Sequence, residues 1–142
     1  MLSDAVSVNY VAVVIAAAAY FILGAIWYAP TMFGSRWMKH EWGQEEQRHR
    51  TPTILAYIGE VIIALIIAYI LALLFEVTHT TDMLEGIVLA LWIWLGFIAT
   101  THFSAVLWGR KTLKSFFVHA GFMLLGLLIM GALIPLVKAW FF

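Results

Sequence analysis

Three ionisable side chains interrupt long apolar stretches of this sequence: Glu60, His102 and His119. A carboxylate and two imidazoles can exchange protons, hold a polar substrate or ligate a metal ion. An ionised group placed inside a membrane is costly unless it is paired, hydrated or protonated, so residues of this kind are functional candidates by default. Their types therefore point to proton or ligand chemistry, provided that the apolar stretches span a membrane.

The apolar stretches have the length that membrane-spanning helices need, about 20 residues each. The 142-residue chain is 64% hydrophobic and 11% charged, which is too apolar for a soluble domain of its size. We expect one membrane domain with an all-α fold, an integral membrane up-down-up-down four-helix bundle. The predicted spans are Tyr10–Ala29, Ile54–Phe75, Gly86–Leu107 and Phe116–Val137.

The connection between the first and second spans holds the only long polar segment. Phe33, Trp37 and Met38 recur there at helical spacing, opposite Arg36 and Lys39. This pattern predicts a short amphipathic helix over residues 31–42 that lies in the plane of the lipid headgroups.

Basic residues are distributed unevenly among the connections. The first connection holds four and the third holds three, so seven of the eight Lys and Arg residues lie on one side of the membrane. The positive-inside rule makes that side cytoplasmic and places both termini outside. We expect aromatic side chains to anchor the spans at the two interfaces; they are Trp27, Tyr28, Trp37, Trp108 and Trp140.

The three ionisable residues are predicted to lie at similar depths from the cytoplasmic side. Counting along the predicted spans at 1.5 Å per residue, Glu60 lies roughly 9 Å in, His102 roughly 8 Å and His119 roughly 5 Å. Glu60 also belongs to a row of alanines spaced by four, which favours a position facing protein rather than lipid. We expect a buried polar layer to which Thr101 and Tyr57 contribute hydroxyl groups.

Three interpretations of this layer remain open: hydrogen bonds that only fix helix packing, a proton- or substrate-handling site, and a metal or haem site. Glu and His are suitable ligands for Zn²⁺ or Fe²⁺. The sequence has no HxxxH or ExxH pair within a span and no cysteine, so we predict no metal site and leave any cofactor unknown. No triad order, phosphate-binding glycine loop or dinucleotide motif predicts an enzyme.

A set of mostly aromatic, glycine and proline residues carries a resemblance to a known family: Asn9-Tyr10, Gly24, Trp27-Tyr28-Ala29-Pro30, Phe33-Gly34, Trp37-Met38-Lys39, Gly109-Arg110 and Ala120-Gly121. Most of the chain resembles a family of small uncharacterised bacterial integral membrane proteins, a domain of unknown function. The resemblance implies a four-helix bacterial membrane protein and no activity. In a bacterial inner membrane, the outer side on which the positive-inside rule places both termini is the periplasm.

The sequence favours a transport-like protein with a protonatable Glu/His site, slightly ahead of a structural or accessory membrane protein. A net charge of zero argues against nucleic acid as a partner. We expect contact with membrane lipids and a small-molecule or ion substrate. We also expect a homo-oligomer, because Gly121, Gly126 and Gly131 offer more close-packing surface than one neighbouring helix needs.

Overall fold

The computed structural model describes residues 8–27 and 54–141, all of whose regular structure is helical. Four helices in this part of the chain are long and apolar enough to cross a membrane, as the sequence predicts. The predicted interfacial helix at residues 31–42 lies outside the described residues. The elements are α2 (Tyr10–Trp27), α4 (Ile54–Val77), α5 (Met83–Ile93), the π-helical segment η1 (Trp94–Ala99), α6 (Thr100–Leu107) and α7 (Leu113–Phe141).

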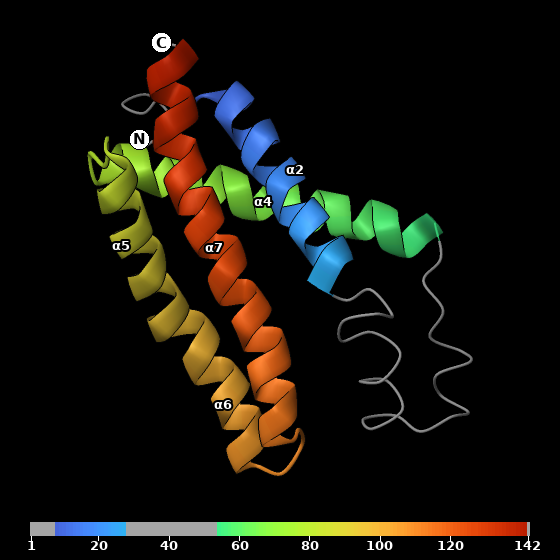
Figure 1. The fold of residues 1–142 in the computed structure, drawn as a ribbon. Coiled ribbons are helices and arrows are strands. Elements are labelled where there is room, and N and C mark those ends of the chain that lie inside the picture. The colour runs from blue at the N-terminus through green and yellow to red at the C-terminus, as the bar shows by residue number, and fades with distance from the viewer. Residues whose placement is uncertain (1–7, 28–53, 142) are drawn as a thin grey trace.

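Helix α7 is the central element of the fold. It packs along α2 on one side and along α5, η1 and α6 on the other, and α5, η1 and α6 together form one continuous span (Figure 1). Half of the most apolar part of α7 is buried, against 28% for α4. Helix α7 therefore contacts all the other spans.

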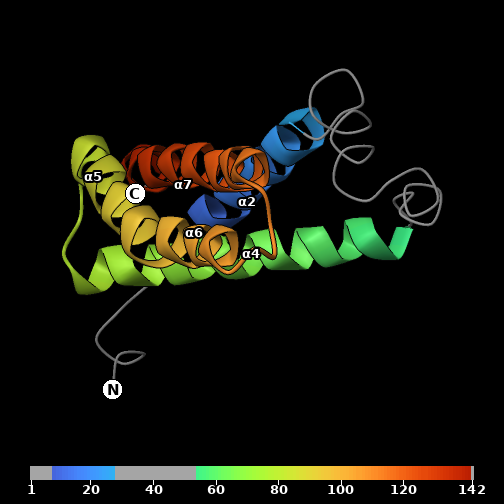
Figure 2. The same ribbon diagram turned by 90° about the horizontal axis from the view of Figure 1, so that it is seen from below.

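Helix α4 lies across α2 and α7 rather than alongside them (Figures 1 and 2). It packs mainly against α2 and crosses it in the opposite chain direction, so that the Tyr69 ring stacks on Tyr10 and the Tyr57 ring meets Phe21. The buried residues of α4 begin at Ala64, and most of its large apolar side chains are exposed. In a membrane, lipid covers such side chains.

Glycines allow the helices around α7 to approach closely. A Cβ atom added to Gly86 would lie 2.0 Å from the carbonyl oxygen of Gly131, so α5 and α7 cross with their backbones in contact. A Cβ atom at Gly126 would lie 2.7 Å from the Tyr20 ring of α2. At Gly121, the nearest atom is in the Trp27 side chain. The glycine series predicted to serve an oligomer therefore packs against α2 and α5 of the same chain.

The turns that follow α4 and α6 have the same construction. After α4, the Thr80 amide donates to the Phe75 carbonyl at 2.8 Å. After α6, the Arg110 amide donates to the Ala105 carbonyl at 3.0 Å. In both turns the preceding residue has a positive φ, 58° at His79 and 75° at Gly109, which is the Schellman ending of a helix.

Each turn then ends in a residue that caps the next helix. The Asp82 carboxylate accepts from the Leu84 amide at 3.0 Å, and the Thr112 hydroxyl oxygen accepts from the Ser115 amide at 3.1 Å. These caps satisfy amides that a helix leaves without an intrahelical partner, and so they fix where α5 and α7 begin.

Candidate functional site

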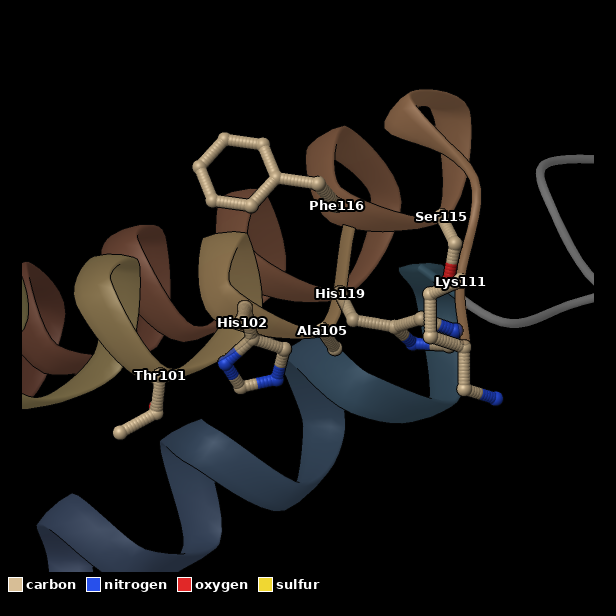
Figure 3. Close-up of a pocket in the computed structure, with 7 residues that line it drawn as sticks. All are labelled: Thr101, His102, Ala105, Lys111, Ser115, Phe116 and His119. Atoms are coloured by element: carbon tan, nitrogen blue, oxygen red, sulfur yellow. The ribbon is translucent and has the colours of Figure 1, made fainter. Parts of the chain in front are cut away.

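A partly open pocket of about 340 Å³ lies between α6, α7 and the turn that joins them. It brings together two of the three ionisable residues predicted to share a layer, His102 and His119, and the predicted Thr101. Both imidazoles point to the same side of the helix pair, and the Lys111 side chain extends on that side too (Figure 3). The full lining is Thr101, His102, Ala105, Lys111, Ser115, Phe116 and His119.

The turn between α6 and α7 positions the cationic part of the pocket. Gly109 adopts the left-handed conformation that ends α6, and the amides of Arg110 and Lys111 both donate to the Ala105 carbonyl. The Thr112 hydroxyl then accepts from the Ser115 amide and caps the start of α7, and Ser115 is 2% exposed. The backbone around Lys111 is therefore held on both sides, and its side chain starts from a fixed point at the pocket edge.

The orientation of His102 follows from a set of hydrogen bonds to η1. The hydroxyls of Thr100 and Thr101 donate to the carbonyls of Gly96 and Phe97 at 2.8 and 2.7 Å. The Nδ1 atom of His102 lies 2.9 Å from the carbonyl of Ile98. Three consecutive side chains thus bond to three consecutive carbonyls, each four residues earlier. This pattern stabilises the π-helical segment, whose wider turn disturbs the usual backbone pairing.

The bond to Ile98 also fixes the tautomer of the His102 imidazole. A carbonyl oxygen only accepts hydrogen bonds, so Nδ1 must carry the proton that it donates. In the neutral ring, Nε2 then has a lone pair and can accept a proton or bind a ligand. This arrangement suits a general base or a metal ligand as well as a packing role.

Two tryptophans hold α7 on either side of His119. The indole nitrogen of Trp27, from α2, donates to the Val118 carbonyl at 3.0 Å. The indole nitrogen of Trp94, the first residue of η1, donates to the Ala120 carbonyl at 2.8 Å. His119 lies between these two carbonyls, so the backbone that carries it is anchored to both neighbouring spans.

Glu60 and Tyr57 do not line this pocket. Both lie exposed on the first half of α4. The row that contains Glu60 is buried at Ala64, Ala68 and Ala72, whereas Glu60 itself is exposed. No charged side chain is buried among the described residues. The Glu60 carboxylate interacts electrostatically with the Tyr20 phenol of α2, which donates to the Met123 sulfur at 2.9 Å.

The donor set of the pocket suits an anion better than a metal ion. Two imidazoles face the same space, but residues 8–27 and 54–141 contain no group of three His, Cys, Asp or Glu side chains able to hold a metal. Lys111 adds a positive charge, which repels a cation. Lysine and protonated imidazoles instead make strong hydrogen bonds to carboxylate or phosphate oxygens.

Sequence reasoning missed Lys111 and Ser115. In the sequence, Lys111 stands out only as part of the basic turn that sets the membrane topology, and this gives no indication that it lines a pocket. The five-residue interval from Trp108 to Thr112, with Gly109 in second position, was the available sign that this turn is tight.

Of the predicted interface anchors, Trp27 is half-buried against α7, Trp108 and Trp140 are exposed, and Tyr28 and Trp37 lie outside the described residues.

Most of the chain matches one known protein family. Residues 11–134 match the family described as "Protein of unknown function (DUF1761)", and the chain is a member of it. This agrees with the family resemblance seen in the sequence. Comparisons with curated proteins and with solved structures gave no match.

Proposed function

We propose that this protein is a small transport-like protein of the bacterial inner membrane whose ligand occupies the α6–α7 pocket. One observation carries the proposal: imidazoles from two different spans and a lysine from their connecting turn line a single partly open cavity. An imidazole ring can accept a proton and donate one, so these side chains can exchange a proton with a bound ligand. The positive groups favour an anionic ligand.

Electrical recording from reconstituted vesicles tests this function. Acetate, succinate or phosphate is applied rapidly at pH 6 and at pH 8, and charge movement is measured. We expect a response to at least one anion that is larger at the lower pH, and its loss in the His102→Asn, His119→Asn double variant. No response to any of these anions from vesicles that contain folded protein would contradict the proposal.

We propose that the pocket faces the cytoplasm and that the opposite turn faces the periplasm. The support is the positive-inside rule, because Arg110, Lys111 and Lys114 lie beside the pocket. The chain has no native cysteine, so single cysteines report sidedness cleanly. A membrane-impermeant maleimide should label Thr81→Cys from the periplasmic side and Arg110→Cys only after the membrane is opened. The reverse pattern would overturn this orientation.

We also propose a homo-oligomer formed through α4. The support is the exposed Glu60 carboxylate, which lies on an otherwise apolar face and makes no ion pair or hydrogen bond within the described residues. A second copy of the chain would remove this carboxylate from lipid. Light scattering with the detergent mass subtracted should exceed the 16.0 kDa of one chain, and Glu60→Leu should change the distribution of masses. A single-chain mass in several mild detergents would refute the oligomer.

A structural or accessory role is the second candidate. It is favoured by the hydrogen bonds that His102 and its neighbours make to η1, because these bonds require no ligand. In that case His102→Asn should lower stability, and no anion should produce a response. The vesicle experiment separates the two functions.

A further inference from the structure

The π-helical segment η1 divides the third span into a part that is fixed to α7 and a part that is not. Before η1, the backbone of Gly86 lies against that of Gly131. Trp94, the first residue of η1, donates to the Ala120 carbonyl of α7. After η1, helix α6 has no buried residue. The rotation of the span about its own axis is therefore set by packing in α5 and only weakly in α6.

A π turn takes in one residue more than an α turn, because its backbone bonds join residues five rather than four positions apart. Single π turns inside α-helices are frequent at functional sites. If η1 became α-helical while α5 stayed in place, every residue of α6 would advance by one position around the helix. This advance is a rotation of about 100°. Each position on α6 would then be occupied by the residue that precedes its present occupant in the sequence.

The sequence of α6 provides polar groups for both positions of the helix. In the structure, Thr101, His102 and Ala105 line the pocket from α6 (Figure 3). The residues that precede these three are Thr100, Thr101 and Ser104, which all carry a hydroxyl group and are exposed. The rotation would therefore replace an imidazole at the pocket with a hydroxyl, and the lining of the pocket would stay polar.

Side-chain hydrogen bonds stabilise η1 in its π-helical form. The side chains of Thr100, Thr101 and His102 bond to the carbonyls of the residues four positions earlier, at 2.7–2.9 Å. Two of these three residues, Thr101 and His102, also line the pocket. The form of η1 and the lining of the pocket are therefore linked through the same side chains.

We propose that η1 is a conformational switch, in which conversion of the π-helix to an α-helix rotates α6 and replaces His102 at the pocket with Thr101. The inference rests on the proposed function in one respect, that a ligand bound at His102 favours the π-helical form. The rotation has to break the edge-on contact of Phe103 with Phe116 of α7, whose ring centroids lie 5.5 Å apart. Phe103 is already 40% exposed. Helix register shifts of this kind occur in microseconds to milliseconds.

The reaction of single cysteines with a water-soluble maleimide tests the switch, because the chain has no native cysteine. Such a reagent reaches a partly open pocket more readily than a side chain that lipid covers. Ala105→Cys reports the present position of α6, and Ser104→Cys reports the rotated one. The variant Thr100→Val, Thr101→Val keeps the side-chain size and removes two bonds to η1. We expect it to raise the reaction rate of Ser104→Cys relative to Ala105→Cys by about tenfold, as the loss of two hydrogen bonds implies.

Thr78→Val is the matched control, because the Thr78 hydroxyl donates to the carbonyl four residues earlier at the end of α4, outside η1. It should leave the ratio of the two rates unchanged. Deletion of Leu95 takes the additional residue out of η1, so that an α-helix can form with His102 still at the pocket. In this background the two valine substitutions should no longer change the ratio. Thr100→Val alone should give a smaller change in the same direction as the double variant, and circular dichroism checks that each variant is folded.

Two outcomes would overturn the switch. One is an unchanged ratio in both folded valine variants, and the other is a change of equal size in Thr78→Val. An anion response in the vesicle experiment together with an unchanged ratio would overturn the switch and leave the proposed function intact. A changed ratio without a response to any anion would support the switch and contradict the proposed function.

Discussion

The two turns at opposite ends of the α5–α6 span share one backbone design and differ in what their side chains do. Residues 78–82 and 108–112 each combine a Schellman ending, a positive φ in second position and a capping residue in fifth position. In the first turn, the threonine side chains hydrogen-bond to each other. The Thr78 and Thr80 hydroxyls lie 2.8 Å apart, and Thr80 is buried.

The surroundings of the two turns also differ, because the first turn is tightly packed and the second borders a pocket. Near the first turn, Lys138 of α7 forms an ion pair with Glu76 of α4, and Gly86 meets Gly131 backbone to backbone. Near the second turn, α6 has no buried residue and the side chains surround a cavity. Backbone geometry alone therefore does not make a site. The first turn holds the spans together, and the second lies at a pocket that a lysine and two imidazoles line.

The largest expected effect is at the packed end. Gly86→Ala places a Cβ atom 2.0 Å from the Gly131 carbonyl oxygen, so the two backbones must separate. We expect the free energy of unfolding in detergent to fall by about 3 kcal/mol. Gly59→Ala is the matched control, because its added Cβ meets nothing within 4 Å. Equal stability of the two variants would show that the α5–α7 crossing is not tight.

A smaller effect is expected at the support of the pocket. Trp94→Phe keeps an aromatic ring and removes the hydrogen bond from the indole to the Ala120 carbonyl. We expect a loss of about 1 kcal/mol in unfolding free energy, together with altered imidazole signals for His119. Trp92→Phe changes an exposed tryptophan of the same span and should change neither. Unaltered His119 signals in Trp94→Phe would remove the proposed role of η1 in positioning that residue.

Much of the fold follows from the sequence because apolar length and composition decide it. The helix ends do not follow in the same way. The third span begins at Met83 rather than Gly86, and the fourth at Leu113 rather than Phe116. The caps Asp82 and Thr112 add a first turn that hydropathy does not register. Short-range hydrogen bonding, rather than burial, sets these limits.

The candidate site follows from the sequence only in part. Counting residues along the spans indicates that His102 and His119 lie at similar depths, and the structure places both at one pocket. The position of Glu60 depends on how α4 crosses α2, which no local pattern encodes. Trp94 of η1 donates a hydrogen bond to Ala120 of α7, which is 26 residues further along the chain. The periodicity of apolar residues in the sequence does not reveal tertiary contacts of this kind.

The smallest expected effects concern the residues with positive φ in the two turns. His79 holds at φ 58° a conformation that favours glycine, and Gly109 holds its equivalent at 75°. His79→Gly should raise the free energy of unfolding by about 0.5 kcal/mol, since the relief of strain exceeds the added chain entropy. Gly109→Ala should lower it by about 1 kcal/mol. Thermal unfolding of both variants measures these changes in stability. Changes of the same sign in the two variants would show that the backbones of the two turns are not equivalent.

Stabilisation by a ligand tests most directly whether the end of the molecule at the α6–α7 turn binds the ligand while the end at the α4–α5 turn only stabilises the fold. The measurement is the unfolding temperature with and without inorganic phosphate, for the parent chain, Glu76→Gln and Lys111→Ala. A ligand that binds the folded state raises this temperature. We predict that Glu76→Gln lowers the unfolding temperature and keeps the rise with phosphate, and that Lys111→Ala loses the rise. Loss of the rise in Glu76→Gln, or its persistence in Lys111→Ala, would contradict the division of roles between the two ends.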